Sequence, residues 1–189
     1  ARQYPTLCEQ ILLPHKSYEG RTIHALRVGT LPASSGDVLL ITGSIHAREW
    51  GGADTCISLA ADLLEAYSKG SSLVYGGKTY TRTDVSTILE GMHIVFLPNV
   101  NPDGRFWSQN EDRMWRRNRN KDSSGGNPDC VGVDLNRNYD FLWDFKKYFH
   151  PDAEIATSDN PCDPQQTWCG KAPLSENETQ NVDWLLKKY

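Results

Sequence analysis

The 189-residue sequence lacks several features that would place it in a specialised class of protein. It has no run of 18 apolar residues, so no segment is predicted to span a membrane. It has no basic excess, because 20 Lys and Arg stand against 24 Asp and Glu, and this balance predicts neither a nucleic-acid nor a membrane partner. None of its five cysteines forms a Cys-x-x-Cys pair, which argues against a cysteine-ligated zinc cluster.

The apolar pattern that is present predicts one domain of the α/β class. The length of 189 residues suits a single packed core. Residues 37–42 and 93–97 carry continuous apolar runs, which are typical of strands covered on both faces. Residues 22–28 alternate as a half-buried strand does, while residues 53–67 are apolar at helical spacing and Gly70 ends that helix. A sheet with helices packed on its faces follows from this pattern.

Shorter segments are expected to be less regular. Residues 1–20 and 70–80 are predicted to be largely irregular, and residues 83–89 are predicted to form a short helix. Ser175 and Glu178 have the spacing of a capping box that opens the last helix. The aromatic residues between 141 and 149 are expected to pack in the core.

Two chemically reactive side chains follow the first apolar strand. His46 and Glu49 lie three residues apart between that strand and the next helix, so both can face one metal ion. The loop beginning at Asn99 follows the other apolar strand, and ligands of open sheets gather at the carboxyl ends of strands. The alternative is an exposed pair without a ligand, since chance gives such a spacing in about a quarter of sequences of this composition.

The stretch 99–140 is polar and rich in arginine. A nucleic-acid stripe, a solvated loop and a pocket for a substrate carboxylate or oxyanion are three interpretations of it. The third is favoured because the guanidinium offers a fixed fork of donors and the rest of the chain is acidic. The arginines are Arg105, Arg113, Arg116, Arg117, Arg119 and Arg137.

The cysteines favour an extracellular protein. Cys130 and Cys162 lie in loops rich in Gly, Pro, Asn and Asp, which suits a bridge that clips a long loop in an oxidising compartment. Cys56 lies on the apolar face of the helix 53–67 and is expected to be buried as a small hydrophobic residue.

Four segments in a fixed order resemble one known family. They are His46–Trp50 (HAREW), Asn101–Gly104 (NPDG), Arg113–Arg116 (RMWR) and Gly132–Asn138 (GVDLNRN). Together they resemble the zinc metallocarboxypeptidases of the carboxypeptidase A/B type, from about residue 20 to the end of the sequence. This resemblance implies a mixed, largely parallel β-sheet with helices on both faces. It also implies a secreted peptidase that hydrolyses the C-terminal peptide bond of peptides and proteins.

The resemblance assigns roles to residues around one Zn²⁺ ion. His46 and Glu49 would be zinc ligands, and Asp134 would accept the second ring N–H of His46 and fix its tautomer. Arg116 would stabilise the oxyanion of the tetrahedral intermediate. Arg48 would hold carbonyl groups of the substrate.

The same resemblance places the substrate carboxylate. Asn136 and Arg137 would grip the free C-terminus of the peptide, which explains removal of terminal residues, and Arg113 would be a further helper. A disulfide between Cys130 and Cys162 also resembles one in the animal enzymes.

One departure from the family limits these expectations. The third zinc ligand, a His, and the catalytic Glu come later in the family than any residue present here, and none of His24, His93 and His150 stands at a suitable point. Residues 1–189 are therefore expected to be the N-terminal portion of a single catalytic domain, incomplete at its C-terminus and inactive when isolated. A second chain could carry the rest. The alternative function is a non-catalytic module that binds peptide C-termini, or an inactive fragment.

Overall fold

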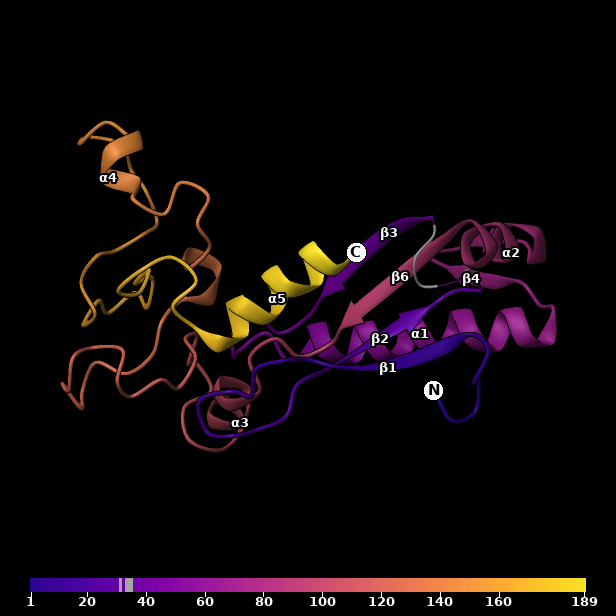
Figure 1. Cartoon of the computed structure of the whole chain (residues 1–189), viewed down its shortest axis with the longest axis horizontal. Helices are drawn as coiled ribbons and strands as arrows, with labels where there is room; N and C mark the ends of the chain where they lie inside the picture. Colours follow the sequence, from indigo (N-terminus) through magenta and orange to yellow (C-terminus); the bar gives the residue numbers. More distant parts are fainter. Residues whose placement is uncertain (31, 33–35) are drawn as a thin grey trace.

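A four-stranded sheet supports the rest of the chain in the computed structural model, which describes residues 1–30, 32 and 36–189 (Figure 1). Its strands, in the order β1-β2-β6-β3, are β1 (Cys8–Leu12), β2 (His24–Val28), β6 (Met92–Leu97) and β3 (Asp37–Thr42). β1 pairs antiparallel with β2 and β2 antiparallel with β6, whereas β6 and β3 run parallel. The sheet is mixed, as predicted, but parallel pairs do not predominate among its described strands.

Helices cover both faces of this sheet, as predicted. They are α1 (Gly51–Lys69), α2 (Arg82–Gly91) and α5 (Asn177–Lys188). The central strand β6 has apolar side chains on both sides, so consecutive residues enter different cores. Ile94 and Phe96 pack with residues of α1 and α2, while Val95 and Leu97 pack with residues of α5. No helix in the described part of the chain is both long and apolar enough to cross a membrane.

The strongest patterns located their elements well, whereas one capping motif was misplaced. The helix predicted over 53–67 is α1, and Gly70 ends it with a φ of 64°, the left-handed conformation that glycine accommodates. A capping box does open a helix, but it joins Thr81 to Asp84 at the start of α2. The predicted box of Ser175 and Glu178 is wrong, because α5 has no side-chain cap and the Glu178 side chain turns into the interior.

Several elements lie where the sequence predicted irregular chain. They are β1, the hairpin of β4 (Leu73–Tyr75) and β5 (Lys78–Tyr80), and α3 (Pro102–Asn110). The hairpin strands are short and largely exposed, so they lack an apolar pattern. Residues 111–176, all of them described, form long loops interrupted by η1 (Leu135–Arg137) and α4 (Phe145–Tyr148). These loops gather beyond the carboxyl ends of β3 and β6 (Figure 1).

The aromatic residues of 141–149 do not form the expected core. Phe141 is 83% exposed, and Tyr148 and Phe149 are also exposed. Trp143 and Phe145 are half-buried and pack against a small separate cluster that includes Val133 and Trp168.

One carboxyl group is buried where α5 begins. Glu178 accepts a hydrogen bond from Asn118 Nδ2 over 3.2 Å, and its Oε1 has no partner among the described residues. Glu176 lies beside it and accepts bonds from Asn118 and Asn120. Burial, reinforced by the charge of Glu176, raises the pKa of Glu178 to about 8, although the Asn118 bond acts in the opposite direction.

Glu178→Gln should flatten the pH dependence of stability. The folded protein retains a proton on Glu178 between its usual pKa of 4.5 and about 8, whereas the unfolded chain releases it. The stabilising contribution is complete below pH 4.5 and disappears as the pH rises to about 8, with a slope of at most about 1.4 kcal/mol per pH unit. Urea denaturation across this range would measure the change, with the exposed Glu65→Gln as control. Equal slopes for parent and Glu178→Gln would contradict the buried proton.

Candidate metal centre and carboxylate site

The two loops that begin at the ends of β3 and β6 are joined by backbone hydrogen bonds. Gly43 N donates to Leu97 O over 2.9 Å, and Val100 N donates to Gly43 O over 3.0 Å. A Cβ on Gly43 would lie 2.6 Å from the carbonyl oxygens of Gly52 and Pro98, so this close approach requires glycine. Both strand ends therefore meet at one edge of the sheet, as the sequence predicted.

His46 and Glu49 face each other in the first of these loops. His46 Nδ1 lies 2.7 Å from Glu49 Oε1. The imidazole is 7% exposed, whereas the Glu49 side chain is 52% exposed, so the pair opens to solvent on the carboxylate side. Ala47 N donates to Arg116 O over 3.0 Å, which fixes this loop against the segment that carries the predicted oxyanion residue.

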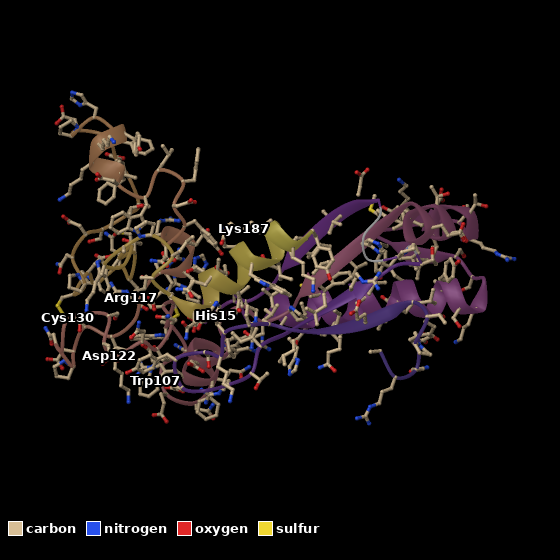
Figure 2. The ribbon with its side chains drawn as sticks, viewed as in Figure 1. His15, Trp107, Arg117, Asp122, Cys130 and Lys187 are labelled. Carbon is tan, nitrogen blue, oxygen red and sulfur yellow. A yellow bond between two sulfur atoms is a disulfide. The ribbon has the colours of Figure 1, made fainter. Side chains whose placement is uncertain are left out.

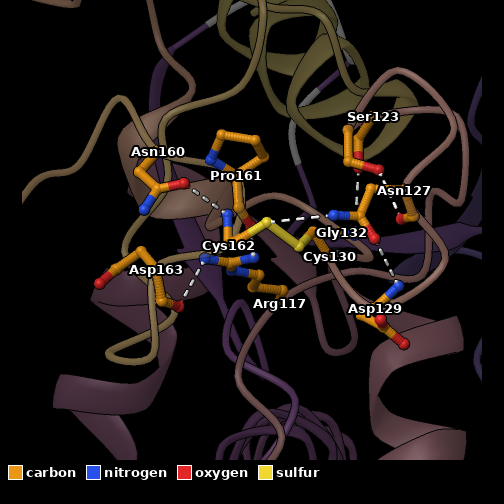
Figure 3. The surroundings of a disulfide bond; sticks show 11 residues. Arg117, Ser123, Asn127, Asp129, Cys130, Gly132, Asn160, Pro161, Cys162 and Asp163 are labelled. Carbon is orange, nitrogen blue, oxygen red and sulfur yellow. Dashed lines mark hydrogen bonds between the residues drawn. A yellow bond between two sulfur atoms is a disulfide. The ribbon is translucent and has the colours of Figure 1, made fainter.

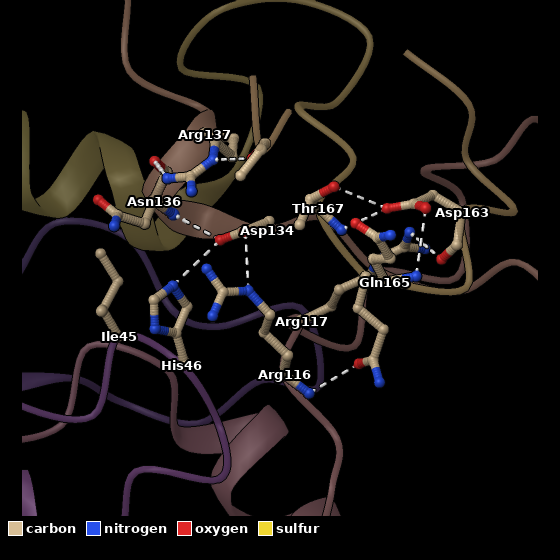
Figure 4. A network of polar contacts seen from close by, with 12 residues as sticks. Ile45, His46, Arg116, Arg117, Asp134, Asn136, Arg137, Asp163, Gln165 and Thr167 are labelled. Atoms are coloured by element: carbon tan, nitrogen blue, oxygen red, sulfur yellow. Dashed lines mark hydrogen bonds and ion pairs between the residues drawn. The ribbon is translucent and has the colours of Figure 1, made fainter. Parts of the chain in front are cut away.

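A fully buried carboxylate lies on the other side of the imidazole (Figure 4). Asp134 Oδ1 is 3.3 Å from His46 Nε2, and Asp134 Oδ2 accepts a hydrogen bond from Arg116 Nε over 2.8 Å. Asp134 Oδ1 also accepts from Asn136 N, which caps η1. Burial alone would raise the pKa of Asp134, but the contact with His46 and the charge of Arg116 together hold it below its usual range.

The pair of His46 and Glu49 fits two positions of a zinc site. With Nε2 turned to Asp134, Nδ1 is the nitrogen that can offer a lone pair on the Glu49 side. Two ligand atoms of one tetrahedral zinc lie about 3.3 Å apart. His46 Nδ1 and Glu49 Oε1 would therefore need to move apart by less than about 1 Å to admit the ion. No group of three His, Cys, Asp or Glu suited to a metal occurs among the described residues. The pair alone does not supply the three protein ligands of a catalytic zinc.

The predicted arginines differ in how closely they approach this pair. Arg116 is the nearest in the network, through Asp134, and its backbone N donates to Gln166 Oε1 over 2.7 Å. Arg48 is half-buried and donates from Nη1 to Met114 O over 3.1 Å. Arg113 is exposed and has no polar contact among the described residues, so the structure does not bring it to the pair.

The predicted carboxylate-binding residues lie in η1, next to Asp134. Arg137 donates from Nε to Ala156 O over 2.7 Å and from Nη1 to Asn136 O over 2.9 Å. Its Nη2 donates to none of the described residues. Asn136 is exposed, and its side-chain amide likewise makes no hydrogen bond in the described chain. Arg137 is thus held in place by two hydrogen bonds, and both residues keep donor groups that no described residue occupies.

Two other arginines of the stretch 99–140 hold loops together, and Figure 2 labels one of them, Arg117. Arg117 is buried and donates to the carbonyl oxygens of Pro161 and Asp163. The guanidinium of Arg119 lies 3.7 Å from the centre of the Trp107 ring, a cation–π contact. These side chains stabilise the fold. Fewer arginines are therefore available to bind a ligand than their number in the sequence suggested.

The loops contacted by Arg117 are also clipped by a disulfide between Cys130 and Cys162, the pairing that the family resemblance implied (Figure 3). Cys8, Cys56 and Cys169 are buried and unpaired. The expectation for Cys56 is confirmed.

Two residues that shape the site could not be identified from the sequence. Ser44 has a φ of 51° and donates from Oγ to Glu49 O over 3.1 Å, which holds the turn that presents His46. Gln166 holds the backbone of Arg116 across 50 positions of sequence. Neither residue belongs to a periodic pattern, and only the tertiary contacts reveal them.

The Asn101–Gly104 segment has a structural role in this arrangement. Asn101 is buried and donates from Nδ2 to Arg117 O over 3.1 Å and to Ile45 O over 3.3 Å. Its Oδ1 accepts from Gly104 N over 2.9 Å and caps α3. One side chain therefore ties the His46 loop to the arginine-bearing segment.

The whole chain matches a known family and known relatives. Residues 1–189 match the Peptidase_M14 family, described as zinc carboxypeptidase. An inactive metallocarboxypeptidase ECM14 of Ajellomyces capsulatus is 37% identical over 176 residues, which cover 91% of this chain and 25% of that protein. Carboxypeptidase B of Astacus astacus is 33% identical over 191 residues, which cover 100% of this chain and 52% of that protein.

Solved structures show the same fold. Bovine thrombin-activatable fibrinolysis inhibitor, in complex with tick carboxypeptidase inhibitor, aligns with a TM-score of 0.72 and 28% identity over 99% of this chain and 51% of that one. Carboxypeptidase A of Helicoverpa armigera aligns with a TM-score of 0.70 and 26% identity over 98% of this chain and 39% of that one. The chain thus spans from a quarter to about half of the length of these proteins.

Asp134→Asn should destabilise the chain strongly. The neutral amide would leave the Arg116 guanidinium without its buried counter-charge, and loss of one partner of a buried pair costs about 3 kcal/mol or more. Chemical denaturation at neutral pH would measure the loss. Asp159→Asn removes an exposed carboxylate that pairs with Lys146 and should change the free energy of unfolding by less than about 0.5 kcal/mol. Similar effects of the two substitutions would contradict the central place of Asp134.

Proposed function

The chain belongs to the zinc carboxypeptidase family, and from this premise we propose that it serves in zinc-dependent hydrolysis of the C-terminal peptide bond of peptides and proteins. The observation that carries the proposal is the buried Asp134, which contacts both His46 and Arg116. A metal ligand and a cationic group are thereby held at fixed positions on one carboxylate. Such an arrangement suits a reaction that develops negative charge beside a metal ion.

The metal in this proposal is a single Zn²⁺ held in part by His46 and Glu49. When bound, zinc polarises the scissile carbonyl and lowers the pKa of a water ligand. Asp134 keeps the proton of the imidazole on Nε2, so that Nδ1 remains a ligand. A third protein ligand and a general base must come from residues other than those described here. The rest of a longer protein, or a second chain, would supply them.

The arginines of the proposal act on the peptide. Arg116 donates to the oxyanion that forms at the scissile carbonyl, and one such donor is worth about 3 kcal/mol of transition-state stabilisation. Its Nε is engaged by Asp134, which leaves the terminal nitrogens of the guanidinium for the substrate. Arg48 contacts peptide carbonyls further along the substrate. Arg113 contributes positive charge at the surface, since it is exposed and has no fixed partner among the described residues.

Asn136 and Arg137 bind the free carboxylate of the peptide. The Nη2 of Arg137 and the amide of Asn136 have no hydrogen-bond partner among the described residues, and a guanidinium pairs well with a carboxylate. This pairing restricts the reaction to chain ends, because an internal peptide bond offers no such charge.

A second candidate function is non-catalytic binding of peptide C-termini. It is favoured by the relatives that are named inactive metallocarboxypeptidases, and the described residues include no group of three side chains suited to a metal. In this case Asn136 and Arg137 would retain their role without turnover. The disulfide between Cys130 and Cys162 supports an extracellular location for either function.

Zinc binding should depend on His46. We expect His46→Ala to weaken binding of zinc to the 189-residue chain by at least the roughly tenfold that outer partners of metal ligands contribute. His24→Ala is the matched control, because His24 is an exposed strand residue. Equilibrium dialysis with metal analysis would measure both variants. Equal zinc binding by His46→Ala and the parent would remove His46 from the metal site.

Peptide hydrolysis by the full-length protein distinguishes the two candidate functions. The enzyme should release single residues from peptides with free C-termini and leave amidated peptides intact. Arg116→Ala should lower kcat by about 100-fold, and Arg137→Ala should mainly raise KM. Arg82→Ala, which replaces an exposed arginine of α2, is the control and should change both constants little. Binding of free C-termini without any release of residues would instead support the non-catalytic module.

A further inference from the structure

One asparagine of the sequence opens an N-glycosylation sequon. Asn177, Glu178 and Thr179 have the pattern Asn-x-Ser/Thr with a middle residue other than proline, and no other Asn of the 189 residues does. The sequon coincides with the first turn of α5, which begins at Asn177. The candidate metal and carboxylate sites do not use this side chain.

The side chain of Asn177 is accessible and only partly engaged. Asn177 is exposed, whereas the other two residues of the sequon are buried. Its Nδ2 donates one hydrogen bond, to Lys16 O over 2.9 Å. A primary amide has two N–H groups, and the second has no partner among the described residues. The amide can therefore exchange one hydrogen for a sugar and keep the bond to Lys16.

The loop that Asn177 contacts is held to α5 independently by Asn181. The backbone N of His15 donates to Asn181 Oδ1 over 3.0 Å, and Asn181 Nδ2 donates to His15 O over 2.8 Å. Asn181 is fully buried and lies about one helical turn from Asn177. A bulky, solvated group on Asn177 would thus leave this attachment of the loop intact.

The rest of the sequon is closed in the folded chain. Thr179 is 0% exposed, and its hydroxyl oxygen lies 2.8 Å from both Asn138 Oδ1 and Glu176 O. Glu178 also turns into the interior. An enzyme that reads the hydroxyl of Thr179 beside Asn177 could not reach it once α5 has formed. Modification would therefore have to precede the folding of this segment.

We propose that Asn177 carries an N-linked oligosaccharide, attached in the secretory pathway while this segment is still unfolded. The donor is an oligosaccharide on a polyprenyl diphosphate. A bond forms between Asn177 Nδ2 and C1 of the first sugar as the bond from that carbon to the diphosphate oxygen breaks. The lipid diphosphate leaves with the electron pair, and the amide proton passes to solvent. The disulfide between Cys130 and Cys162 supports the oxidising compartment that this route requires, and the modification is independent of peptide hydrolysis.

Peptide mapping of the full-length protein, secreted from mammalian cells, tests the site. Peptide N-glycosidase in heavy-oxygen water should convert Asn177 to a labelled Asp, which mass spectrometry would locate. Asn177→Gln should lose the sugar and the label at this position, whereas Thr179→Ser should retain both, because serine also completes the sequon. Asn110→Gln is the matched control, since Asn110 is exposed and donates one bond to Phe106 O but opens no sequon. It should leave the sugar on Asn177.

A second comparison tests the order of modification and folding. Purified oligosaccharyltransferase, supplied with the lipid-linked donor, should glycosylate a synthetic peptide of residues 171–185 but not the folded protein made in bacteria. An unmodified Asn177 in the secreted protein would overturn the site, and transfer to neither acceptor would contradict recognition of this sequon. Equal transfer to the peptide and the folded protein would overturn the requirement for an unfolded chain and leave the site in place.

Discussion

The burial of the Asp134 carboxylate is the constraint on which the rest of the site depends. An ionised group removed from water requires opposite charge and hydrogen bonds around it, and here His46, Arg116 and the backbone of Asn136 provide them. Those three partners come from different parts of the chain. Satisfying one carboxylate therefore brings together the His46 loop, the arginine-bearing segment and η1, and the orientation of each side chain follows from this need.

The surrounding loops are long, and their stability comes from polar contacts and a covalent link. Residues 111–176 contain little regular structure, so their backbone groups bond to side chains and to the backbone of other loops instead of within a helix or sheet. Arg117 holds two carbonyl oxygens near the disulfide, and Asn101 holds two loops from a buried position. A site built on such loops keeps its geometry because several independent contacts determine each segment.

The sequence was most informative where local pattern and tertiary environment agree. The apolar runs of β3 and β6 and the helical spacing of α1 located three elements closely, and the family motifs identified residues that the structure brings together, such as His46, Glu49 and Asp134. The pattern failed where distant contacts decide the outcome. Glu178 appeared to be a capping residue, but it is buried against Asn118, which lies 60 positions earlier in the sequence.

The arginines near the site show the same limit of prediction from sequence. Arg116 and Arg119 stand three positions apart in one polar stretch and have similar neighbours in sequence. One contacts the buried carboxylate, and the other stacks on the ring of Trp107. Only the path of the chain decides between these outcomes, because a guanidinium can pair with a carboxylate or stack on an aromatic ring.

Gly43 has no side chain, and this allows backbone segments to pack closely beside the site. The backbone of this residue lies against the carbonyl oxygens of Gly52, in the first turn of α1, and of Pro98, just after β6, and no methyl group fits between them. The start of α1 and the end of β6 therefore approach this loop as closely as bare main chain allows. An engineered version could vary residues around His46 and Glu49 to change the chemistry. Position 43 must remain glycine, because any added side-chain atom would push these backbone segments apart.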